Sequence, residues 1–305
     1  MQIKPNVFLI GVQKSATTSL YNWIAQHPDV CGPISTKDTP FFIDDKLFNK
    51  GFSFLESIYS KYYENQKVII NGSAHTVYFE KALKRLSNYN PEAKIILVLR
   101  NPVERAISAY NFAVKRNLDN KDLLSSINEE HMRLKSDDVQ ILSETTYIDH
   151  GKYYEQIATL RKYFKEENTL ILFYKDVKNN PEQVIKETYA FLNLDLQFTP
   201  ELKTLNKTGT VRFKLIKDLV YNNNPIKKFL LKHVFDVIIP YDLKYRIKIS
   251  ILRLITKKDT KTTKKQPKNV IDNQTKLYLY KLLEEDIGNL EKLLNKDLSH
   301  WKLFN

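Results

Sequence analysis

The chain lacks the features that would cross-link it or carry it through a membrane. Its single cysteine, Cys31, excludes an internal disulfide and a cluster of cysteine metal ligands. Only 7 of its residues are glycine, which argues against a barrel and against a glycine-rich fibre. The apolar run at residues 7–10 is far too short for the core of a signal peptide, and no run is long enough to span a bilayer. We therefore expect a cytoplasmic globular protein.

Positive charge, by contrast, is in excess, and the excess lies in one stretch. The formal net charge is +13 over 305 residues, and residues 212–268 hold 16 lysines and arginines against 4 aspartates. Such a stretch suits a polyanionic partner or product, or an acidic membrane surface. A solvated lysine-rich face explains the same composition, so charge alone leaves both interpretations open. Within the stretch, residues 257–268 lack apolar periodicity and predict a basic linker.

The first segment with a chemical pattern is residues 7–20. It begins with an unbroken apolar run, typical of a strand buried on both faces of a parallel sheet. Gly11 and Lys14 follow, and the apolar residues from Leu20 to Ile24 then lie at helical spacing. Between the strand and the helix stand four hydroxyl residues: Ser15, Thr17, Thr18 and Ser19. A strand–turn–helix unit of this composition predicts a phosphate clamp. An ordinary turn with a solvated lysine is the alternative.

A second anion site is predicted after a second buried strand, residues 94–99. Arg100 stands at the carboxyl end of that strand, where open α/β sheets bind ligands. The following helix is marked by an N-cap at Asn101, by Pro102 in the first position, and by Glu104 on the far side of a capping box. Ser108 lies about two turns further along, so that its hydroxyl and the Arg100 guanidinium can share one phosphate.

These two motifs resemble those of the sulfotransferases that use 3′-phosphoadenosine 5′-phosphosulfate (PAPS). Residues 11–20 are similar to the family's 5′-phosphosulfate loop, commonly G-x-x-K-x-G-T-[TS]-S-L, with Ala16 where glycine is usual. Residues 100–108 match its 3′-phosphate motif, R-[ND]-P-x-x-R-x-x-S, at every named position. A P-loop nucleotide kinase is the alternative, but its loop reads G-x-x-x-x-G-K-[ST], and the chain lacks the G-K-[ST].

Two candidate bases follow from weaker resemblances. The segment Lys37-Asp38-Thr39-Pro40-Phe41-Phe42 resembles the K-E-x-x-F-F segment of carbohydrate sulfotransferases, in which the glutamate is the proposed base. Asp38 would take that role, and we expect its carboxylate to stand beside an apolar wall of two aromatic rings. After a strand at residues 68–70, His75 stands where the family usually has serine. It is the alternative base, or a ligand of the acceptor.

Two late segments extend the resemblance over nearly the whole chain. The loop at residues 206–212 resembles the N-x-[ST]-G-x-P-R loop that closes over the nucleotide in bacterial sulfotransferases. The residues of this loop that we assign to nucleotide binding are Lys207, Gly209, Thr210 and Arg212. The ending at residues 293–301 resembles the family's L-L-G-x-D-L-S-x-W tail. Residues 117–150 differ from the family and predict short helices that line an acceptor cleft.

The resemblance implies an α/β, three-layer P-loop-like fold with a central parallel sheet flanked by helices. It implies one sulfotransferase domain over residues 1–305, with a C-terminal helix at 275–295 that packs back on it. The implied reaction is in-line transfer of the sulfuryl group from PAPS, without a metal, to a hydroxyl or amine of a carbohydrate or glycolipid. Lys14, Asp38 and His75 would be catalytic. We expect no nucleic-acid partner, and a location in the cytoplasm or at the inner membrane face. A basic binding module for nucleic acid or membrane is the alternative outside enzymology.

Overall fold

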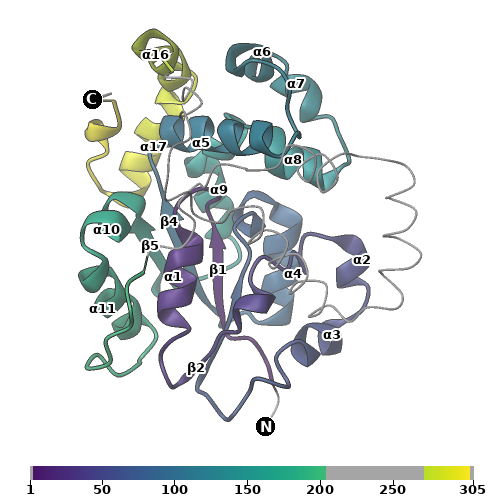
Figure 1. Ribbon diagram of the computed structural model, residues 1–305, viewed down its shortest axis with the longest axis vertical. Coiled ribbons are helices and arrows are strands. Elements are labelled where there is room, and N and C mark those ends of the chain that lie inside the picture. Colours follow the sequence, from purple (N-terminus) through teal and green to yellow (C-terminus); the bar gives the residue numbers. More distant parts are fainter. Residues whose placement is uncertain (1–2, 204–270, 303–305) are drawn as a thin grey trace, which may run out of the picture.

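The computed structural model describes residues 3–203 and 271–302, and its centre is a parallel sheet of five strands. Their spatial order is β2-β3-β1-β4-β5, and every neighbouring pair is parallel (Figure 1). The strands are β1 (Val7–Gly11), β2 (Val30–Cys31), β3 (Val68–Gly72), β4 (Lys94–Leu99) and β5 (Thr169–Phe173). Since β1 lies between β3 and β4, the loops that follow these three strands meet at one edge of the sheet. The predicted α/β class is confirmed.

Helices cover both faces of the sheet, because the strands alternate their side chains between two apolar cores. On one face, Val7 and Leu9 of β1 pack with helices α1 (Thr17–Ile24) and α11 (Pro181–Phe191). On the other face, Phe8 and Ile10 pack with α4 (Glu80–Tyr89), α5 (Pro102–Lys115) and α9 (Tyr153–Leu160). The two cores give three layers, as predicted (Figure 1).

The C-terminal segment forms two helices where one was predicted over 275–295. They are α16 (Asn273–Lys281) and α17 (Glu284–Leu294). The break between them lets Leu283 pack against Gly151, where a Cβ would lie only 3.1 Å from the leucine Cδ2. The backbone N–H of Tyr154 in α9 donates to Asp286 of α17 at 3.1 Å. The segment thus lies against the sheet's helical layer.

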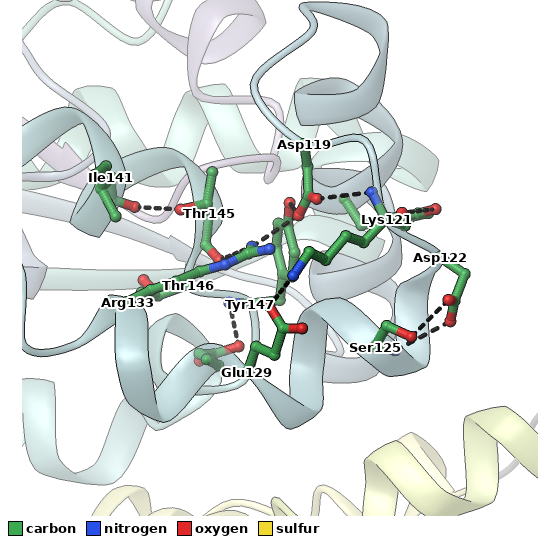
Figure 2. A network of polar contacts seen from close by, with 12 residues as sticks. Asp119, Lys121, Asp122, Ser125, Glu129, Arg133, Ile141, Thr145, Thr146 and Tyr147 are labelled. Atoms are coloured by element: carbon green, nitrogen blue, oxygen red, sulfur yellow. Dashed lines mark hydrogen bonds and ion pairs between the residues drawn. The ribbon is translucent and has the colours of Figure 1, made fainter.

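Short helices between α5 and α9 form a wall beside the sheet. They are α6 (Leu123–Asn128), α7 (Glu130–Arg133) and α8 (Val139–Thr145). Asp119 holds the wall together: it accepts from Arg133 Nη1 at 2.7 Å and from Tyr147 Oη at 2.8 Å (Figure 2). Glu130 accepts the backbone N–H groups of residues 147–149. These bonds fix the loop that leads back to α9.

The other α-helices of the described residues are short. They are α2 (Asp45–Phe48), α3 (Phe52–Ser57) and α10 (Tyr174–Asn179). Strand β2 and helices α2, α3 and α10 were not predicted, because a strand of two residues and helices of four to six residues are too short to show periodicity in the sequence. Among the helices of residues 3–203 and 271–302, none combines the length and the apolar character needed to traverse a bilayer.

Candidate active site

The loop between β1 and α1 has the backbone of an anion site. Lys14 and Ala16 both have positive φ angles, 71° and 61°. No backbone carbonyl accepts from the N–H groups of residues 13–18 within the described part of the chain. The Oγ of Ser15 is buried and also has no partner there. An anion seated at this loop would satisfy these donors together.

Ala16 occupies a position at which glycine would be unstrained. Its backbone is left-handed and forms the N-cap of α1. An L-residue with a Cβ pays about 1–2 kcal/mol for that conformation. This explains the glycine that the resembling loop usually has here. The hydroxyl residues that follow, Thr17, Thr18 and Ser19, lie in the first turn of α1.

Lys14 is a cation in surroundings that do not favour its charge. Its Nζ lies 4.0 Å from the centre of the Phe112 ring, on α5. Burial lowers the pKa of Lys14 to about 8; Glu144 opposes this shift, and the charge of Arg100 adds to it. A phosphate at the loop would supply the missing counter-charge and restore the protonated state.

Arg100 joins the end of β4 to the loop after β1. Its Nη1 donates to the carbonyl oxygen of Lys14 at 3.0 Å. Its guanidinium lies over the ring of Tyr174, with the central carbon 4.4 Å from the ring centre. The two predicted anion-binding segments are therefore in direct contact. Ser108 lies on α5, half-buried, in the second turn.

The start of α5 follows the predicted pattern with one exception. Asn101 is the N-cap, and its side chain accepts from the N–H groups of Val103 and Glu104. The capping box predicted for Glu104 is wrong. The Glu104 carboxylate instead accepts from Nε and Nη2 of Arg100, both at 3.1 Å, because the guanidinium lies one turn away on the same side.

Asp38 stands at the carboxyl edge of the sheet, but not beside the expected apolar wall. Its backbone N–H donates to the carbonyl of Gly72 at 2.6 Å, which ties it to the end of β3. Its side chain is 62% exposed and forms an ion pair of 2.7 Å with Lys37. Phe41 and Phe42 point into the hydrophobic core instead. The prediction of an apolar environment for this carboxylate is therefore wrong.

His75 follows β3 and lies near the other candidates. The ring is half-buried and its Nδ1 is buried without a partner. Burial lowers the pKa of His75, whereas the charges of Glu144 and Asp38 raise it. The Glu144 and Asp38 carboxylates thus act electrostatically on the His75 ring, in opposition to the effect of burial.

Sequence reasoning missed Glu144, a residue of α8 whose side chain reaches the loop after β1. Its carboxylate accepts from Gln13 Nε2 at 2.8 Å and from Arg116 Nη1 at 2.7 Å. Gln13 and Glu144 are 131 positions apart, and no local pattern links them. The one signal in the sequence was the polar residue Gln13 directly before Lys14, whose side chain needs a hydrogen-bond partner.

The other predicted site residues come from a part of the chain that the structure does not describe. Lys207, Gly209, Thr210, Arg212, the basic stretch 212–268 and its linker 257–268 lie outside the described residues. Within the described ranges, no three His, Cys, Asp or Glu side chains gather closely enough to hold a metal ion.

Comparison with known proteins identifies a family of similar sequences. A family profile described as "Sulfotransferase domain" matches residues 4–227. The chain is 31% identical to the membrane-associated sulfotransferase kil1 of Dictyostelium discoideum over 153 residues, which are 50% of this chain and 31% of that protein. It is 21% identical to the bifunctional heparan sulfate N-deacetylase/N-sulfotransferase 1 of Caenorhabditis briggsae over 198 residues, 62% of this chain and 23% of that protein.

Other relatives are similar over shorter segments. The heparan sulfate glucosamine 3-O-sulfotransferase 6 of Mus musculus is 29% identical over 106 residues, 35% of this chain and 30% of that protein. The matched segments thus span less than a third of these relatives. Among solved structures, the sulfotransferase from Alicyclobacillus acidocaldarius superposes with a TM-score of 0.65 at 19% identity, covering 98% of this chain and 99% of that one. This similarity establishes the shared fold.

Proposed function

The chain belongs to the sulfotransferase family, and from this premise we propose that it transfers the sulfuryl group of PAPS to an acceptor hydroxyl or amine. One observation carries the proposal: Arg100, from the predicted 3′-phosphate motif, touches Lys14 of the predicted 5′-phosphosulfate loop. PAPS has phosphate groups at those two ends of its ribose. Two adjacent anion sites of different construction fit one donor of this kind.

Different side chains bind the two phosphates of the donor and take the proton of the acceptor. The loop N–H groups, Lys14 and the hydroxyl of Ser15 bind the 5′-phosphate, and Lys14 donates to the bridging oxygen on which charge develops. Arg100 and Ser108 bind the 3′-phosphate. The acceptor oxygen or nitrogen forms a bond to sulfur while the bond from sulfur to the phosphate oxygen breaks. A base removes the acceptor's proton, and Asp38 and His75 are the two candidates.

We propose a carbohydrate or glycolipid as the acceptor. The Lys37-Asp38 segment, with its resemblance to carbohydrate sulfotransferases, supports this choice. The names of two similar proteins, which act on heparan sulfate, support it as well. The basic stretch 212–268 suits a polyanionic glycan or an acidic membrane surface, and the single cysteine suits the cytoplasm.

Incubation with ³⁵S-labelled PAPS tests the proposal. The acceptors are heparosan, its N-deacetylated form, a simple phenol and a glycolipid, each with the nucleotide product measured beside the labelled acceptor. Label on a glycan supports the carbohydrate assignment, and label on the phenol alone contradicts it. The kinase alternative predicts magnesium-dependent consumption of ATP and no transfer of label, and a result of that kind would overturn the proposed function.

The Arg100→Ala variant should lose discrimination for the 3′-phosphate. Wild-type protein is expected to bind adenosine 3′,5′-bisphosphate about 100-fold more tightly than adenosine 5′-monophosphate, since charge-assisted hydrogen bonds of this kind contribute about 1.5–3 kcal/mol. In the variant the two affinities should converge. Isothermal titration calorimetry measures both. Arg161→Ala is the control, because Arg161 pairs with Glu166 just before β5, at the opposite edge of the sheet. Equal discrimination in wild type and Arg100→Ala would contradict the assignment.

Binding of adenosine 3′,5′-bisphosphate should take up a proton at pH 8. Burial holds the pKa of Lys14 at about 8 in the free protein, so about half of the molecules carry a neutral lysine at that pH. A bound phosphate raises the pKa of Lys14, so the lysine takes up about half a proton at pH 8, and affinity weakens as the pH rises above 8. Calorimetry in HEPES and in Tris separates this proton from the intrinsic heat. An uptake that persists unchanged in Lys14→Ala would rule Lys14 out as its source.

A further inference from the structure

A cluster of buried polar atoms without partners lies behind His75. Eight buried side-chain nitrogen and oxygen atoms have no hydrogen-bond partner in the described part of the chain. Four of them belong to three residues: Nδ1 of His75, Nε2 of His150, and Nε and Nη1 of Arg105. The two imidazole rings meet edge to face with their centres 5.7 Å apart. Arg105 is fully buried, and its charge lowers the pKa of both histidines in addition to the effect of burial.

The hydrogen bonds of His150 assign its tautomer. Thr146 Oγ1 lies 2.5 Å from the carbonyl of Leu142, and the carbonyl can only accept, so the hydroxyl proton is used there. The same Oγ1 lies 2.8 Å from His150 Nδ1 and must therefore accept from it. His150 is thus protonated on Nδ1, which leaves a bare lone pair on Nε2. Burial and Arg105 keep the ring neutral by holding the pKa of His150 well below its ordinary value.

The ring of His150 is held rigidly in this orientation. It stacks on Tyr78 with a centre-to-centre distance of 3.5 Å and an angle of 15° between the planes. The carbonyl of His150 accepts from Gln156 Nε2 at 3.2 Å. Tyr78 in turn donates to Asp149 at 2.6 Å. The lone pair of Nε2 therefore keeps a fixed direction within the cluster.

We propose that His150 is a positioning residue for His75: a buried water accepts from Nδ1–H of His75 and donates to Nε2 of His150. The second lone pair of the same water can accept one N–H of Arg105, so that His75 Nδ1, His150 Nε2 and one nitrogen of Arg105 each gain a partner. This arrangement fixes the Nδ1–H tautomer of His75. Its Nε2, which is not among the buried atoms that lack a partner, is then bare on the open side of the ring.

The consequence concerns the choice of base, and it rests on the proposed function. A bare Nε2 on His75 can take the proton of the acceptor as the acceptor atom bonds to sulfur, and the electron pair of the broken sulfur–oxygen bond leaves on the nucleotide's phosphate. Asp38 is already paired with Lys37 and 62% exposed. The cluster therefore favours His75 as the base. Asp38 then acts only as a negative charge near the site.

Nitrogen-15 NMR of histidine-labelled protein tests the tautomer directly and needs no turnover. The chain has 6 histidines, and His75→Gln and His150→Phe assign the two signals. We expect both rings at pH 7 to be protonated on Nδ1 and bare on Nε2. In His150→Phe, which keeps an aromatic ring on Tyr78, the His75 signals should move to a mixture of tautomers. An Nε2–H tautomer of His75 in the wild type, or an unchanged His75 spectrum in His150→Phe, would overturn the proposal.

Kinetics provide the second readout. His150→Phe should lower kcat about 10- to 100-fold, within the usual range for general-base catalysis, and leave the KM for PAPS unchanged. His150→Gln, whose amide oxygen can accept near the position of Nε2, should recover part of the loss. His27→Phe is the control, since His27 is equally buried but lies beyond the far end of α1. Equal kcat in wild type and His150→Phe would refute the positioning role. A wild type inactive towards every acceptor would refute the proposed function and leave the NMR result standing.

Discussion

Replacement of Lys14 by alanine is expected to lower kcat for sulfuryl transfer about 10³-fold, in the range found when a preorganised donor to a developing charge is removed. The Lys14 ammonium is largely buried at the loop after β1. It lies over the Phe112 ring and is exposed to the charge of Arg100. In the proposed mechanism this ammonium donates to the bridging oxygen of the donor. Labelled PAPS and the best acceptor of the panel give kcat, and nucleotide release without acceptor gives the background rate.

The fold should survive this substitution. The pKa of Lys14 is lower in the folded protein than in the unfolded chain, so below about pH 8 the charged lysine is destabilising and its removal costs the fold no favourable charge. Thermal unfolding followed by circular dichroism should give a Tm equal to or above that of the wild type. Lys186→Ala, on the exposed side of α11, is the matched control and should keep full activity. A Lys14→Ala variant with kcat within tenfold of the wild type would remove Lys14 from the mechanism.

The sequence predicts the sheet well because each buried strand carries its signal locally. The runs at residues 7–10, 68–70 and 94–99 are apolar on both faces, and all three become central strands of the parallel sheet. Asn101 and Pro102 likewise mark the start of α5, since an N-cap and an N1 proline act on their own helix. The contact of Arg100 with Lys14 then follows from topology, because adjacent parallel strands end at one edge.

What the sequence does not predict depends on contacts between distant segments. Glu144 reaches Gln13, and the role of His150 depends on a chain of bonds through Thr146. Asp38 was expected against aromatic rings that follow it closely in the sequence. The rings turn into the core, and the carboxylate pairs with its neighbour Lys37. Sequence patterns predict the secondary structure that carries a side chain. The tertiary packing then determines the direction in which that side chain points.

In the proposed mechanism, the groups that bind the donor and those that act on the acceptor come from two kinds of structure. The donor side is built on strand ends and helix starts, which the sheet fixes. We expect the acceptor side to be formed by the wall of α6, α7 and α8, which carries Glu144, and by the loop after α8, which carries His150. Removal of the bonds that hold the wall should therefore separate donor binding from transfer.

Replacement of Asp119 by alanine is expected to lower the free energy of unfolding by about 3–5 kcal/mol, the cost of removing one partner of a buried ion pair. The Asp119 side chain is 1% exposed and accepts from Arg133, Tyr147 and the N–H of Lys121 (Figure 2). Urea unfolding at pH 7 measures the loss. Asp122→Ala, which removes the exposed N-cap of α6, is the matched control and should cost about 1 kcal/mol. A loss no greater than that of the control would show that the wall does not depend on Asp119.

The pH dependence and the binding data make this prediction specific. Burial acts to raise the pKa of Asp119, but the hydrogen bonds from Arg133 and Tyr147 outweigh it and hold the pKa below its ordinary value. The stabilisation by the Asp119 carboxylate is therefore complete above the ordinary aspartate pKa and disappears as the pH falls through the lower pKa of the folded state. The free energies of unfolding of wild type and Asp119→Ala should therefore converge in acid.

Under conditions where the variant is folded, its affinity for adenosine 3′,5′-bisphosphate should remain, because Lys14 and Arg100 belong to the sheet edge. Transfer to the acceptor should fall, because the wall no longer holds Glu144 and His150. Parallel loss of nucleotide affinity would show instead that donor and acceptor sides form one cooperative unit.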